Sequence, residues 1–130
     1  MNVQNAIEIN RALIHLANID GLLCSYEVAL NLNALKDIAA KFDSDQKKLV
    51  DKFVDKNADG SYKTKGENNE LNDFGSKHEE FEKAATKMVE AEVEVELITF
   101  KKEDLKDGTG LAVNPPALVL LPLLNTVIIK

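Results

Sequence analysis

The sequence predicts a mostly α-helical protein of the α+β class, and three patterns support this. Apolar residues recur at alternating steps of four and three along 28–53, and a shorter segment at 73–90 repeats that spacing. The period then changes to strict alternation over 92–97, which is typical of a β-strand. We expect a long antiparallel helical hairpin (about 25–55 and 73–90), an N-terminal helix and a small β-sheet using 92–100.

The composition is ordinary for a soluble globular protein. The chain has 130 residues, of which 45% are hydrophobic and 29% are charged, so we expect one domain over 1–130. The formal charge is -6 and Arg11 is the only arginine, which argues against binding of nucleic acid or anionic lipid by charge alone. The start of the sequence does not resemble a signal peptide, and prolines interrupt the apolar stretch 111–129, so we expect a cytosolic protein without a membrane span.

The first two helices follow from apolar faces and from turn residues. Residues 4–18 present one apolar face, and Asp20-Gly21 provides a turn after them. Ser25 is a good N-cap for the second helix, which we expect to run to about Asp55.

Residues 56–72 are polar and are predicted to form a loop, with a short hairpin near 61–64. Asp55, Asn57, Asp59 and Gly60 match the first, third, fifth and sixth positions of an EF-hand calcium loop. The twelfth position is Gly66 instead of the bidentate glutamate, so we favour a plain helix-ending turn. Weak cation binding at 55–60 stays open.

The remaining elements are a third helix over about 73–90, the strand and an apolar C-terminal segment. In the strand, Val93, Val95 and Leu97 should face inward while three glutamates face water. Its partner is expected to be 1–3, 126–129 or another copy of the chain. Pro115-Pro116 can open a short helix in 111–130, which we expect to dock on the hairpin or on another subunit.

No combination of residues indicates a specific chemistry. Cys24 has apolar neighbours, which favours a buried and unreactive thiol over a nucleophile. His15 and His78 lack the spacing of a metal motif, and no glycine-rich phosphate loop is present. We therefore expect no catalytic, cofactor-binding or metal residue, and no enzyme activity.

The order of segments resembles a group of small, mostly uncharacterised proteins encoded by tailed bacteriophages. The matching pieces are SYEVALNLNALKDIAAKF, VDKNADGSYK, EEFEKAATKMVEAEVEVEL and NPPALVLL, whereas the ending LPLLNTVIIK departs from the pattern. The resemblance implies an accessory or virion-associated role, in the host cytoplasm during assembly and in the virion.

We therefore expect a non-catalytic protein–protein interaction or assembly protein, with other viral structural proteins or a second copy as partner. The alternative is a phage-encoded inhibitor that binds a host defence protein or sequesters a signalling nucleotide; a single arginine argues against the nucleotide version. The interaction residues we expect are the strand glutamates and the C-terminal apolar side chains: Glu92, Glu94, Glu96, Leu118, Val119, Leu121, Leu123, Leu124, Val127 and Ile129.

Overall fold

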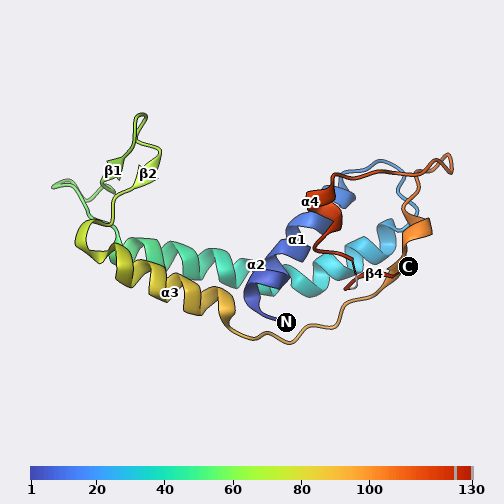
Figure 1. Ribbon diagram of the computed structural model, residues 1–130, viewed down its shortest axis with the longest axis horizontal. Coiled ribbons are helices and arrows are strands. Elements are labelled where there is room, and N and C mark those ends of the chain that lie inside the picture. Colours follow the sequence, from blue (N-terminus) through green and yellow to red (C-terminus); the bar gives the residue numbers. More distant parts are fainter. Residues whose placement is uncertain (125, 130) are drawn as a thin grey trace. The chain divides into compact units, whose positions relative to one another are not determined.

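The computed structural model describes residues 1–124 and 126–129 and confirms a mostly α-helical protein of the α+β class (Figure 1). Where the sequence predicts one domain over 1–130, the chain forms two compact units. Unit 1 comprises Met1–Ala39 and Glu92–Lys130, and unit 2 comprises Ala40–Ala91.

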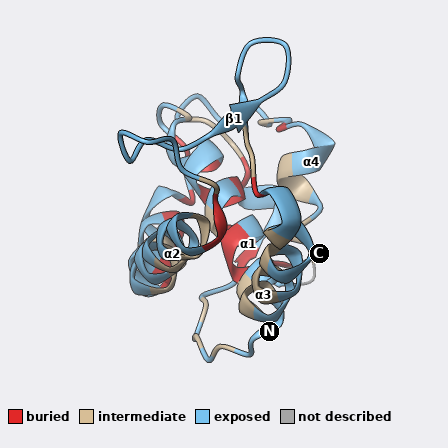
Figure 2. Ribbon diagram, turned by 90° about the vertical axis from the view of Figure 1, so that its left-hand side faces the viewer, coloured by how far each residue is buried: buried red, intermediate tan, exposed pale blue. Residues whose placement is uncertain are grey.

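Unit 1 begins with helix α1 (Val3–Ala17), which matches the predicted N-terminal helix. Asn2 caps it: the Asn5 amide donates to the Asn2 side chain at 2.8 Å, and the Asn2 amide donates back to the Asn5 side chain at 3.4 Å. The buried side of α1 is visible in Figure 2. It packs with the first part of helix α2 (Ser25–Phe53), where Val28 and Leu35 are buried.

The C-terminal segment completes the core of unit 1. The short helix α4 (Ala117–Leu120) lies beside α1 (Figure 1). Strand β3 (Phe100–Lys101) pairs in parallel with strand β4 (Ile128–Ile129), and the 3-10 helix η2 (Lys102–Asp104) follows β3. The predicted pairing of the 92–100 region with 126–129 is therefore present at its C-terminal end.

The predicted strand over 92–100 is wrong for most of its length. Glu92 forms an isolated bridge with Asn2, residues 93–99 are extended without a ladder, and only Phe100 belongs to a strand. The predicted alternation of burial is confirmed, since Val93, Val95 and Leu97 pack against the core of unit 1 while Glu94 and Glu96 are exposed. Near the C-terminal end of this segment, a side chain of a helix takes the place of a neighbouring strand.

That side chain is Asn31 of α2, which is the one polar residue among the buried residues of the described chain. Its Nδ2 donates to the carbonyl oxygen of Ile98 at 2.8 Å, and the Ile98 amide donates to its Oδ1 at 2.6 Å. One side chain thus satisfies both backbone groups of Ile98, as a paired strand would. Near the two ends of the segment, the Val93 amide donates to the Met1 carbonyl and the Phe100 amide donates to the Val127 carbonyl.

Unit 2 contains the second part of α2, the 3-10 helix η1 (Gly75–Lys77) and helix α3 (His78–Glu90), which lies alongside α2 in this unit (Figure 1). Phe53 and Phe74 are buried, and Phe81 stacks on Phe74 with ring centroids 4.0 Å apart. Leu49 packs against the same cluster, so this part of the predicted hairpin is present.

The hairpin does not extend along the whole apolar seam of α2, by which we mean its apolar residues spaced by four and three between Val28 and Phe53. Val28, Leu32 and Leu35 of that seam join the core of unit 1, while Leu49 and Phe53 join the cluster of unit 2. One regular sequence pattern therefore serves two separate cores.

The polar loop 56–72 is more ordered than its composition predicts. Strands β1 (Thr64–Lys65) and β2 (Leu71–Asn72) pair in antiparallel fashion, and Lys56 bridges Tyr62 across a tight turn. Gly60 has a positive φ of 87° and its amide donates to the Asn57 carbonyl, which is the pattern of a type I turn followed by a left-handed glycine. The predicted hairpin near 61–64 is thus shifted, with its turn at 57–60.

Replacing Asn31 with leucine should destabilise unit 1. The amide and carbonyl of Ile98 would lose their partly buried hydrogen bonds to Asn31, at a cost of about 1–3 kcal/mol in the free energy of unfolding. Urea unfolding measures this change. Asn33→Leu is the matched control on the exposed side of α2, where we expect a change within about 0.5 kcal/mol. Equal effects of the two substitutions would contradict the role of Asn31.

Candidate functional site

The structure divides the predicted C-terminal interaction residues into two groups. Leu123 and Val127 are fully buried in the core of unit 1, so they stabilise the fold and cannot meet a partner without unfolding it. Val119 and Leu124 are half-buried against the same core. The C-terminal segment therefore docks within its own chain through these side chains.

Two of the predicted residues remain open to solvent. Leu118 is 84% exposed and Leu121 is 64% exposed, on and directly after α4. The α4 helix turns Val119 and Leu120 toward the core, and these two leucines point away from it. The side chain of Ile129 lies outside the described part of the structure.

The three strand glutamates lie along the extended segment, with exposed side chains. A Glu92 carboxylate oxygen is 3.4 Å from the N-terminal ammonium of Met1. Such an exposed ion pair is weak. The bridge between Asn2 and Glu92 and the hydrogen bond from the Val93 amide to the Met1 carbonyl connect the start of the segment to the start of α1.

The exposed leucines border two hollows between α1 and the C-terminal segment. One hollow has a volume of about 520 Å³ and the other of about 440 Å³. Glu8, Leu121 and Pro122 line both hollows, and Leu118 lines the second. We call this surface, defined by Glu8, Arg11, His15, Leu118, Leu121 and Pro122, the α1–α4 face.

The α1–α4 face carries one acidic and one basic side chain from a single helix. Glu8 and Arg11 are one turn apart on α1, and both are exposed. Glu8 Oε1 accepts a hydrogen bond from the side-chain Nε2 of Gln4 at 3.4 Å. Within the described residues, no carboxylate oxygen lies within 4.0 Å of the Arg11 guanidinium. The face therefore offers charges of both signs beside apolar hollows.

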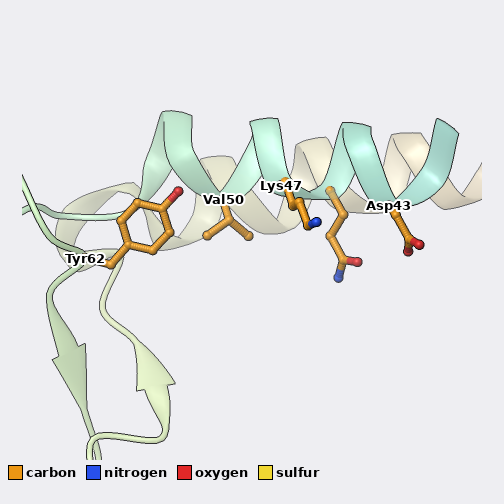
Figure 3. Close-up of a pocket in the computed structure, with 5 residues that line it drawn as sticks. Asp43, Lys47, Val50 and Tyr62 are labelled. Carbon is orange, nitrogen blue, oxygen red and sulfur yellow. The ribbon is translucent and has the colours of Figure 1, made fainter. Parts of the chain in front are cut away.

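A further hollow of about 210 Å³ lies in unit 2, between α2 and Tyr62 (Figure 3). Asp43, Lys47 and Val50 of α2 line it. Tyr62 Oη donates to Asp51 Oδ1 at 3.0 Å, and Lys56 Nζ lies 3.1 Å from the same oxygen. These two bonds, the one from Lys56 first, lower the pKa of Asp51. The arrangement links the polar loop to the helix.

Cys24 is buried, as its apolar neighbours predict. Burial raises the pKa of its thiol to about 11. Each unit of pKa lowers the thiolate fraction at a fixed pH below the pKa by a factor of ten, so the thiol is a poor nucleophile at neutral pH. Neither histidine is placed in a packed core: His15 is exposed at the α1–α4 face, and His78 is exposed with its Nε2 3.0 Å from Glu82 Oε1.

The polar side chains of the 55–60 turn bind to neighbouring residues of the chain. Asp59 Oδ1 accepts hydrogen bonds from the amide and the hydroxyl of Ser61, and these bonds lower the pKa of Asp59. Asn57 Nδ2 donates to Ser61 Oγ at 3.1 Å, and Asp55 Oδ1 is 3.8 Å from Lys77 Nζ. Among the residues that the structure describes, no three side chains of His, Cys, Asp or Glu gather as a potential metal site.

The described helices include none that is both long and apolar enough to cross a membrane. Comparisons with known protein families, with curated proteins and with solved structures found no match.

The sequence predicts Leu118 and Leu121 as interaction residues but not the α1 side of the α1–α4 face, which is more than a hundred residues away in the chain. Arg11 is conspicuous as the single arginine, but nothing in the sequence places it beside Leu118 and Leu121.

Calcium should leave the melting temperature unchanged. Asp59 and Asn57 are already engaged by Ser61, and the bidentate glutamate of an EF-hand is replaced by Gly66. Thermal unfolding with millimolar calcium, and with magnesium as control, measures this. A rise of several degrees that is specific to calcium would contradict the described geometry of the turn.

Cys24 should react slowly with a thiol reagent at pH 8. With its pKa raised to about 11, the thiolate fraction is about 100-fold below that of an unshifted thiol. The folded pKa is above the unfolded one, so its contribution to stability is complete below pH 9 and is lost as the pH rises through about 11. Labelling rates in native buffer and in urea test this; equal rates would contradict it.

Proposed function

We propose that the chain is a non-catalytic assembly protein that associates with a second copy of itself through the α1–α4 face. The observation that carries the proposal is the exposure of Leu118 and Leu121 beside two hollows on the same surface. Exposed apolar groups that are grouped together and rimmed by polar residues are typical of protein interaction sites.

The size of the hydrophobic effect supports this use of the two leucines. Burying a leucine side chain contributes about 1.5–3 kcal/mol. In a symmetric contact, Leu118 and Leu121 of both copies are buried, so this contribution is made by each leucine on each copy. This favourable free energy is opposed by the loss of translational and rotational freedom when two copies associate, so we expect a moderate affinity. A surface that has projecting apolar side chains next to hollows can bind a copy of itself when the side chains of each copy enter the hollows of the other.

The setting we propose is bacteriophage assembly, as an accessory or virion-associated component. It rests on the order of the segments along the chain, from the long second helix through the Asp59-Gly60 turn to the proline-started tail. Because the interior of unit 1 takes up Leu123 and Val127, the apolar part of the proposed contact comes from Leu118 and Leu121.

Replacing both exposed leucines with aspartate should abolish self-association while retaining the fold. We expect Leu118→Asp with Leu121→Asp to raise the dissociation constant at least about 100-fold, because buried apolar contacts are replaced by charges. Light scattering over a range of protein concentrations measures the mass, and circular dichroism checks the helix content. Leu118→Gln with Leu121→Gln is a milder second variant with good helix formers.

The matched control is Leu111→Asp, because Leu111 is also exposed in unit 1 (68%) and does not line either hollow. At each protein concentration, the mass of its assembly measured by light scattering should equal that of the unchanged chain. The proposal fails if the unchanged chain stays monomeric at millimolar concentration, or if the double variants associate as strongly as the control.

A further inference from the structure

We infer that the self-contact is a closed two-fold dimer in which Glu8 of each copy pairs with Arg11 of the other across antiparallel α1 helices. This inference rests on the proposed function and specifies its partner and its symmetry. It starts from the position of the two charges, which line the same hollow as Leu118 and Leu121.

The spacing of Glu8 and Arg11 suits a two-fold axis. Three residues along an α-helix correspond to a rise of about 4.5 Å. If two antiparallel copies of α1 meet about an axis between these residues, Glu8 of each copy lies opposite Arg11 of the other, and two ion pairs form. A parallel arrangement would bring glutamate to glutamate and arginine to arginine, which is unfavourable.

The charges have no stronger partner within the chain. In the described residues, Arg11 has no carboxylate within ion-pair distance, and Glu8 has only the long hydrogen bond from Gln4. Pairing with a second copy would therefore not break an existing ion pair. An isologous contact of this kind also closes on itself, so association should stop at two copies and not continue into filaments.

The test uses charge reversal and mixing. Glu8→Lys makes both members of each cross-copy pair basic, and Arg11→Glu makes both members of each pair acidic. Each variant alone should dimerise about tenfold more weakly than the unchanged chain, because two attractive pairs become repulsive. An equimolar mixture of the two variants should dimerise again. The heterodimer joins two basic side chains of one copy to two acidic side chains of the other, so its affinity should lie within about threefold of the original.

Lys36→Glu is the control for Arg11→Glu, since Lys36 is exposed on α2 in unit 1 and gives the same change of net charge. It should leave the dissociation constant unchanged. Analytical ultracentrifugation measures all of the constants, and a mass tag on one variant identifies the heterodimer.

Failure of the mixture to restore association would overturn the inference. So would single variants that dimerise like the control, or a mass that keeps growing beyond two copies. If the leucine variants are monomeric in that case, the proposed function stands and only the dimer geometry is wrong. If the unchanged chain does not associate, both fail.

Discussion

The fold of unit 1 depends on how a long extended segment is held without a neighbouring strand. Residues 93–99 have one side of apolar groups on the core, but their backbone lacks the ladder that usually fixes such a segment. The buried amide of Asn31 replaces that ladder at one position, with two hydrogen bonds to Ile98. Because a buried side-chain amide must find both a donor and an acceptor, this pairing fixes the register of the segment on the helix.

The position of the C-terminal segment follows from that register. Ile98 is two residues before Phe100, whose amide donates to the Val127 carbonyl and begins the parallel pairing of β3 with β4. This pairing, with the burial of Leu123 and Val127, sets where α4 lies against α1. The exposure of Leu118 and Leu121 thus follows from how the C-terminal segment docks in unit 1.

The helices could be predicted because their signals are local. Spacing of apolar residues by three and four identifies α1, α2 and α3 without knowledge of what they pack against. The alternation over 92–97 also correctly predicts one-sided burial, but alternation reports which side is buried and not whether a neighbouring strand exists. Asn31 gives no signal, since an asparagine within a helical pattern is ordinarily a surface residue.

The interaction surface could be predicted only in part. Leu118 and Leu123 are alike in sequence, and α4 has only four residues, too few to show a helical period. Which leucine is buried depends on the contact with α1, which is distant in the chain. The same holds for the seam of the second helix, whose uniform spacing does not reveal that it serves two cores.

Hydrogen exchange of the backbone amides, followed by NMR in the native state, tests the role of Asn31 most directly. We expect the Ile98 amide to be protected nearly as well as the amides in the middle of α1. The amides of Val95, Leu97 and Thr99, which have no partner among the described residues, should exchange fast. Fast exchange at Ile98, or equal protection along the whole of 93–99, would contradict it.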